Sequence, residues 1–98
     1  AKSFDTFCPL GPFIQTNFEQ NPELGIKCFV NNELKQDGNT RDMIFSIGDI
    51  LCFVSSIMTL LPGDVILTGT PEGVSKVGPG DEIKIEIETI GTLVNSIK

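Results

Sequence analysis

The sequence predicts an α+β fold that is mainly β, with one amphipathic helix near residues 46–60. Two observations carry this prediction. Around residues 25–36 and 81–97, apolar and polar residues alternate, which is the two-residue period of strands. Between these regions apolar residues recur every three or four positions, as on a helix with one apolar side. At 98 residues the chain is one domain or part of one, with room for a modest core.

The first predicted element is a β-hairpin. Residues 25–30 alternate in polarity, and residues 33–36 are the natural return strand. Asn31 and Asn32 predict the turn between them, because asparagine tolerates the left-handed backbone that a two-residue hairpin turn requires. Asp37, Gly38 and Asn39 predict a second turn.

The predicted helix starts at Ser46, since Ser46 and Asp49 form the acidic variant of a capping box. Pro62 and Gly63 are expected to end it. Its apolar positions form one wide stripe, which we expect to pack flat against a sheet or at an interface. The stripe consists of Ile47, Ile50, Leu51, Val54, Ile57, Met58 and Leu61. A subunit interface and the domain core both remain open for it.

Residues 62–74, which read PGDVILTGTPEGV, are the most distinctive candidate site. The apolar run 65–67 lies between turn residues and predicts a strand buried on both faces. After it, Gly69 would let a ligand approach the backbone, and Pro71 restricts Thr70 to an extended conformation. Such a strand end is suited to hold a substrate, although an ordinary strand and tight turn would explain the same residues.

The last third of the chain predicts two antiparallel strands at 81–88 and 92–97, joined by a turn at 89–91. In the first of them isoleucines should face inward and charged side chains outward. Its glutamates are therefore interpreted as a solvated surface and not as a metal cluster. The glycine-rich stretch 72–80 is not a phosphate-binding loop, because Lys76 is not followed by Ser or Thr and a helix.

Composition narrows the possible partners. The formal net charge is −6, which argues against nucleic-acid binding and against an anionic membrane surface. No apolar run is long enough to span a membrane, and the start of the chain shows no signal-peptide pattern. Cys8, Cys28 and Cys52 are scattered, which predicts reduced, buried thiols in a cytoplasmic protein. Because the chain opens with Ala1 and not Met, we expect an upstream segment.

The opening residues contain a second candidate site. Lys2 is followed by the aromatic rings of Phe4 and Phe7, in a stretch that proline and glycine make irregular. A lysine that is partly desolvated by such rings could hold a carboxylate or stabilise an enolate. A solvated lysine near a chain end is the alternative, since charged side chains are mostly exposed.

Four segments, in this order, resemble those of the fumarylacetoacetate hydrolase family. Residues 2–12 resemble its GKSFDTFxPxGP segment, 39–45 its NTxxMIF, 62–74 its PGDVIxTGTPxGVG and 90–95 its IGxLxN. Together they cover nearly the whole chain. The resemblance implies that residues 1–98 are the C-terminal portion of a single catalytic domain of this type, with a mixed β-roll fold.

The resemblance also implies a function. Family members act on small 2-oxo or 1,3-diketo acids and hydrolyse C–C bonds, decarboxylate or isomerise through an enolate stabilised by Mg²⁺, or by Mn²⁺ or Ca²⁺. It further implies that the protein forms a homodimer and that its binding partner is a small-molecule oxo-acid substrate. The alternative is a non-catalytic β-roll module for binding or assembly that lacks the metal site.

Site residues follow by matching positions. The resemblance implies that Lys2 is the counterpart of the family's catalytic lysine, and that it contacts substrate together with the turn formed by Gly69, Thr70 and Pro71. Thr6 corresponds to a hydroxyl in the outer shell of the metal. The family's metal-binding carboxylates precede the segment that matches residue 2, so we expect the metal to be bound mainly upstream of this chain.

Overall fold

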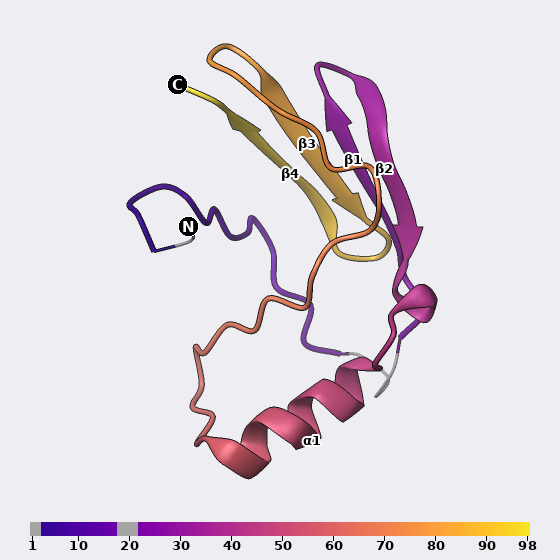
Figure 1. Cartoon of the computed structure of the whole chain (residues 1–98), viewed down its shortest axis with the longest axis vertical. Coiled ribbons are helices and arrows are strands. Elements are labelled where there is room, and N and C mark those ends of the chain that lie inside the picture. The colour runs from indigo at the N-terminus through magenta and orange to yellow at the C-terminus, as the bar shows by residue number, and fades with distance from the viewer. Residues whose placement is uncertain (1–2, 18–21) are drawn as a thin grey trace.

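The computed structural model describes residues 3–17 and 22–98. Within them lie four strands, one 3-10 helix and one α-helix (Figure 1). In chain order these are β1 (Gly25–Val30), β2 (Glu33–Asn39), η1 (Thr40–Asp42), α1 (Ile47–Ile57), β3 (Glu82–Ile87) and β4 (Gly91–Ser96). The predicted class, α+β and mainly β, is confirmed.

The four strands form one sheet in the order β2-β1-β3-β4, and all three pairings are antiparallel. Strand β1 is central: Val30 lies opposite Glu33 of β2 on one side and Ile83 of β3 on the other. Figure 1 shows α1 beyond one end of the sheet, connected to β3 by a long irregular segment.

Two of the three predicted turns are confirmed, the one at Asn31 and Asn32 and the one at 89–91. Asn31 and Asn32 have φ angles of 51° and 65°, which is the left-handed pair that a two-residue hairpin needs. Thr89, in the turn between β3 and β4, has a φ of 62°. The register of the sheet is therefore set partly by local turn chemistry.

Strand β2 is longer than predicted, because Asp37, Gly38 and Asn39 continue it and do not turn. They lie opposite Lys27, Ile26 and Gly25 of β1. The first residues of β1 have backbone groups that need partners, and these three residues supply them. Turn propensity at Asp37, Gly38 and Asn39 is overridden by pairing.

The predicted buried strand at 65–67 is wrong. These residues belong to no strand, and Val65 and Leu67 are 55% and 53% exposed. A strand requires a neighbour that completes its backbone hydrogen bonds. Within the part of the chain that the structure describes, the sheet is complete with β1 to β4 and leaves this segment unpaired.

Helix α1 starts as predicted, with the Ser46 hydroxyl oxygen accepting a hydrogen bond from the Asp49 backbone N–H at 3.1 Å. It ends at Ile57, however, and not at Pro62. Met58 is already extended, with φ −150° and ψ 154°. In the last turn the hydroxyls of Ser55 and Ser56 donate to the carbonyls three residues earlier, which weakens a helix by competing for its acceptors.

Burial is low throughout. Leu24, at 9% exposure, is the one buried hydrophobic residue among those described, and no residue of α1 is buried. The packing expected for the apolar stripe of α1 is therefore not made within residues 3–17 and 22–98.

The cysteines are free; Cys8 and Cys28 are half-buried, but Cys52 is exposed, contrary to the prediction of buried thiols. No helix in the described part has the length and apolarity needed to cross a bilayer.

Candidate functional site

A groove of about 760 Å³ lies where the end of β2 meets the irregular segment that follows α1. We call it the β2 groove. It is lined by Ile26 of β1, by 37–40 and 42–45 around the end of β2 and η1, by Ile50 of α1, and by the loop 68–72. Segments far apart in the sequence thus meet around one open cavity, as small-molecule sites commonly do.

Three of the residues predicted to bind substrate line this groove together. Gly69, Thr70 and Pro71 are consecutive in its wall. Gly69 has a φ of 103°, and a Cβ built there would meet nothing within 4 Å. Its backbone therefore borders open space, as expected for a position that a ligand could approach.

Gln36 attaches this loop to the sheet. Its side-chain nitrogen Nε2 donates to Thr70 Oγ1 at 2.8 Å and to the Pro71 carbonyl oxygen at 2.7 Å. Gln36 is not among the site residues predicted from the sequence. No local pattern indicates it, because the sequence favours a turn at Gly38 and Thr70 lies 34 residues away.

Glycines allow the loop to lie close to β2. A Cβ on Gly38 would come within 2.9 Å of the Pro71 side chain. Gly73 has a φ of 102°, and a Cβ there would collide with the Lys35 carbonyl oxygen. At both positions a larger side chain would push the loop away from the strand.

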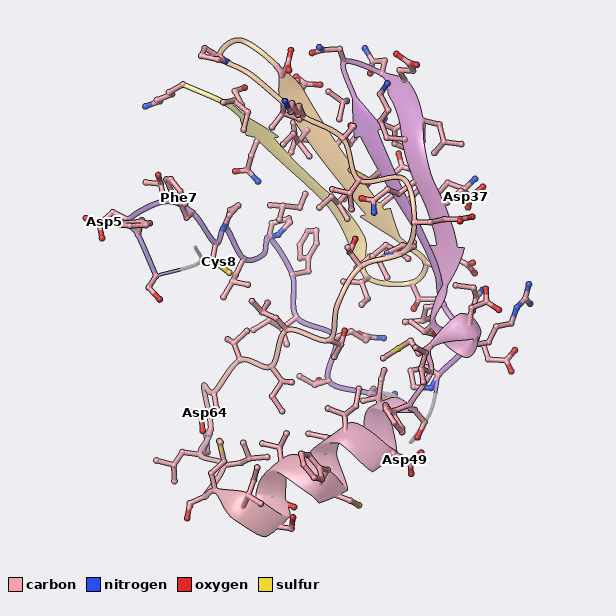
Figure 2. The ribbon with its side chains drawn as sticks, viewed as in Figure 1. Asp5, Phe7, Cys8, Asp37, Asp49 and Asp64 are labelled. Carbon is pink, nitrogen blue, oxygen red and sulfur yellow. The ribbon has the colours of Figure 1, made fainter. Side chains whose placement is uncertain are left out.

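The remaining predicted site residues are not in this groove. Lys2 lies outside the described residues. Thr6 is exposed, has a φ of 67° and is not among the residues that line the β2 groove. Figure 2 shows its neighbours Asp5 and Phe7 on the opposite side of the molecule from Asp37 of β2. The described structure brings Gly69, Thr70 and Pro71 together but does not bring Thr6 to them.

Among the described residues, two groups have shifted pKa values, and neither lines the β2 groove. The pKa of Asp81 is lowered by a hydrogen bond from the Gly78 backbone N–H and by a second from the Asn31 side chain. Burial raises the pKa of the Cys28 thiol on β1. These shifts reflect the turns and the sheet and do not mark an acid or base in the groove.

A metal does not fit the described residues alone. Asp37, Asp42 and Glu72 line the groove, yet no set of three or more His, Cys, Asp or Glu side chains in 3–17 and 22–98 converges to hold an ion. A hard divalent cation takes at least six oxygen ligands. Ligands upstream of this chain therefore stay a prediction.

The sheet, the helix beyond its end and the loop held on β2 define a mainly β domain with an open groove. Over residues 1–98 the chain matches the family described as fumarylacetoacetate (FAA) hydrolase C-terminal. The chain therefore belongs to the fumarylacetoacetate hydrolase family.

Two relatives that are named for enzyme activities are similar to this chain. It is 48% identical to the 4-hydroxyphenylacetate degradation bifunctional isomerase/decarboxylase of Salmonella dublin, over 99% of this chain and 23% of that protein. The crystal structure of 2-hydroxyhepta-2,4-diene-1,7-dioate isomerase from Mycobacterium marinum matches with a TM-score of 0.92 and 49% identity, covering 98% of this chain and 38% of that one.

A third relative was crystallised with ligands. Maleylpyruvate hydrolase from Sphingobium sp. SYK-6, in complex with manganese(II) and pyruvate, matches with a TM-score of 0.90 and 44% identity, covering 97% of this chain and 37% of that one. The chain also spans only 37–41% of the length of the archaeal and mycobacterial curated relatives it matches.

Proposed function

We propose that this chain is part of a divalent-metal-dependent enzyme that acts on small 2-oxo or 1,3-diketo acids. The reaction would be C–C bond hydrolysis, decarboxylation or isomerisation. The observation that carries the proposal is the similarity to maleylpyruvate hydrolase, whose complex holds manganese and pyruvate, itself a 2-oxo acid. The isomerase and isomerase/decarboxylase relatives support the range of reactions.

In this proposal the turn of Gly69, Thr70 and Pro71 binds the carboxylate of the substrate. A hydroxyl that donates to a carboxylate forms a charge-assisted hydrogen bond, which is stronger than a neutral one. Lys2 would be an electrostatic partner of the substrate oxygens, since an ammonium is only a donor and cannot ligate the metal. Thr6 would stand in the outer shell of the metal.

We propose further that residues 1–98 form the C-terminal portion of a single catalytic domain, and that the rest of this domain covers α1. The chain spans about two fifths of several relatives. Phe53 and Ile57 of α1 are 66% and 63% exposed, which is unusual for large apolar side chains on one helix. The metal ligands would belong to the same missing portion.

A titration of the full-length protein tests the enzyme proposal. Mg²⁺ and oxalate, a mimic of the enolate of pyruvate, are added separately and together while Tm is followed. We expect oxalate to raise Tm only when Mg²⁺ is present, by the equivalent of about 2.7 kcal/mol at one hundred times Kd. Mn²⁺ serves as a second metal.

Absence of any metal-dependent shift with either ion would reject the enzyme proposal. It would leave the alternative of a β-roll binding or assembly module without a metal site. The two differ in one further respect: only the enzyme requires a Glu-x-Glu pair and a later Asp ahead of Ala1. The homodimer is implied by the family resemblance, and sedimentation of the full-length protein tests it. The cytoplasmic location rests on the scattered cysteines.

A further inference from the structure

The contact between Gln36 and Thr70 has a defined direction. Gln36 Nε2 lies 2.7 Å from the Pro71 carbonyl oxygen, which has no hydrogen to donate. The atom that faces this oxygen must therefore be the amide nitrogen. The same nitrogen lies 2.8 Å from Thr70 Oγ1. Since an amide nitrogen only donates, the Thr70 hydroxyl must accept in this hydrogen bond.

This direction determines where the Thr70 proton can point. A hydroxyl has one hydrogen and rotates to suit its partners. With its oxygen accepting from Gln36, that hydrogen must be directed elsewhere. No acceptor for it is found among residues 3–17 and 22–98, and Thr70 is exposed in the wall of the β2 groove. The hydroxyl is thus left as a donor for a ligand, strengthened by the bond it accepts.

The position of the hydroxyl is also constrained. Both hydrogens of the Gln36 amide are used on one loop, at two consecutive residues. Gly38 and Gly73 permit close contact of this loop with β2 on either side of the bond. Gln36 is 34 residues from Thr70 in sequence, so only the folded chain brings amide and hydroxyl together.

We propose that Gln36 is a positioning residue that turns the Thr70 hydroxyl into a fixed hydrogen-bond donor for the carboxylate of the substrate. This inference rests on the proposed function. Gln36 acts through Thr70 and need not touch the substrate. A glutamine that merely anchors the loop would stabilise the protein but would have no specific effect on carboxylate binding through Thr70.

The experiment is a double-mutant cycle in the full-length protein with Gln36→Met and Thr70→Val. It measures Kd for Mg²⁺ alone and Kd for oxalate at saturating Mg²⁺. We expect Thr70→Val to weaken oxalate binding about 10- to 100-fold, the scale of a hydrogen bond to a charged group, and Gln36→Met about 5- to 10-fold. Binding of Mg²⁺ alone should stay within about 2-fold in both, since neither side chain would contact the metal.

The positioning role is tested by whether the effects of the two substitutions on oxalate affinity depend on each other. In the Thr70→Val background, Gln36→Met should change oxalate affinity by less than about 2-fold, because the hydroxyl it orients is already gone. Thr70→Ser keeps the hydroxyl and should retain oxalate affinity within about 3-fold, with the dependence on Gln36 intact. If Gln36→Met does not fold, Gln36→Asn replaces it, since the shorter amide stays polar but does not reach Thr70.

The two proposals fail in different ways. Absence of Mg²⁺-dependent oxalate binding in the wild-type protein rejects the proposed function. If the wild type binds but Gln36→Met binds equally well, or loses oxalate affinity by the same factor with and without Thr70, the positioning role is rejected. A parallel loss of Mg²⁺ affinity would also reject it, because that result indicates general disruption of the fold.

Discussion

Asn31 and Asp81 connect the β1–β2 turn to the start of β3. Asn31 Nδ2 donates to Asp81 Oδ1 at 2.9 Å, and the Gly78 backbone N–H donates to Asp81 Oδ2 at 2.8 Å. The oxygen of the same Asn31 side chain accepts from the Glu82 backbone N–H at 3.0 Å. Asn31, which has a left-handed backbone in the turn of the first hairpin, thus also binds the start of β3, 50 residues later in the sequence.

Asp81→Asn should remove a pH-dependent part of the stability. The Gly78 N–H, and then Asn31, hold the folded-state pKa of Asp81 below its ordinary value of 3.8. This contribution is fully present above pH 3.8 and is lost as the pH falls through the lower folded-state pKa. We expect the Tm of the variant to be lower than that of the wild type at neutral pH, with the difference shrinking as the pH falls below 3.8.

Glu82→Gln is the matched control, since it removes one negative charge from the next residue and leaves the bonds of Asp81 in place. Its Tm should follow the wild-type curve across the same pH range. A Tm difference for Asp81→Asn that does not change between pH 7 and the acid limit would contradict the assignment.

Gly73→Ala should destabilise the loop against β2. The residue has a positive φ of 102°, and its new methyl group would collide with the Lys35 carbonyl oxygen. Strain of this kind costs about 1–3 kcal/mol, and the collision adds to it. Chemical denaturation of the full-length protein measures the loss. Gly63→Ala isolates the collision, because Gly63 also has a positive φ, 95°, but opens onto empty space. Equal losses in both variants would mean that the contact with Lys35 is not formed.

Phe53→Asp tests whether another part of the domain covers α1. Phe53 is 66% exposed within this chain. If the full-length protein buries it, a charge there should lower the free energy of unfolding by about 3 kcal/mol or more, whereas a surface substitution costs within about 0.5 kcal/mol. Ser55→Asp places the same charge two residues further along α1 and should stay near the smaller value. Similar small effects for both would show that this side of α1 stays exposed.

Lys2→Ala tests the lysine that the family resemblance assigns to catalysis. In the full-length protein we expect kcat for any 2-oxo acid that it converts to fall at least about 100-fold, the usual scale for a lost electrostatic contact to a developing charge. Lys76→Ala, in the exposed loop before β3, is the control and should leave kcat unchanged. Unaltered turnover in Lys2→Ala would exclude the role.

Local chemistry explains which elements were predictable. The helix start at Ser46 and the turn at Asn31 and Asn32 depend on side chains that act within three residues, so the pattern alone identifies them. The strand ending at Val30 has the alternation of a sheet with two different faces. These elements need no knowledge of distant neighbours.

The predictions that were wrong have a common cause, because each depends on residues that are far away in the sequence. The run 65–67 has the composition of a buried strand, but the described sheet provides no edge for it. Gly38 belongs to a turn by propensity, yet it pairs with Ile26 and accommodates Pro71. Helix α1 has an apolar stripe of which no residue is buried in the described part of the chain. In each case packing and pairing outweigh local preference.

By itself, then, the sequence determined the class of fold, the family and the turn of Gly69, Thr70 and Pro71 as a candidate site. Only the tertiary structure decided what holds that turn, since the amide of Gln36 comes from a strand 34 residues away. The reason is physical. Hydrophobic periodicity and helix capping act over a few residues. The hydrogen bond between Gln36 and Thr70, and so its direction, forms only when the folded chain brings β2 and the loop together.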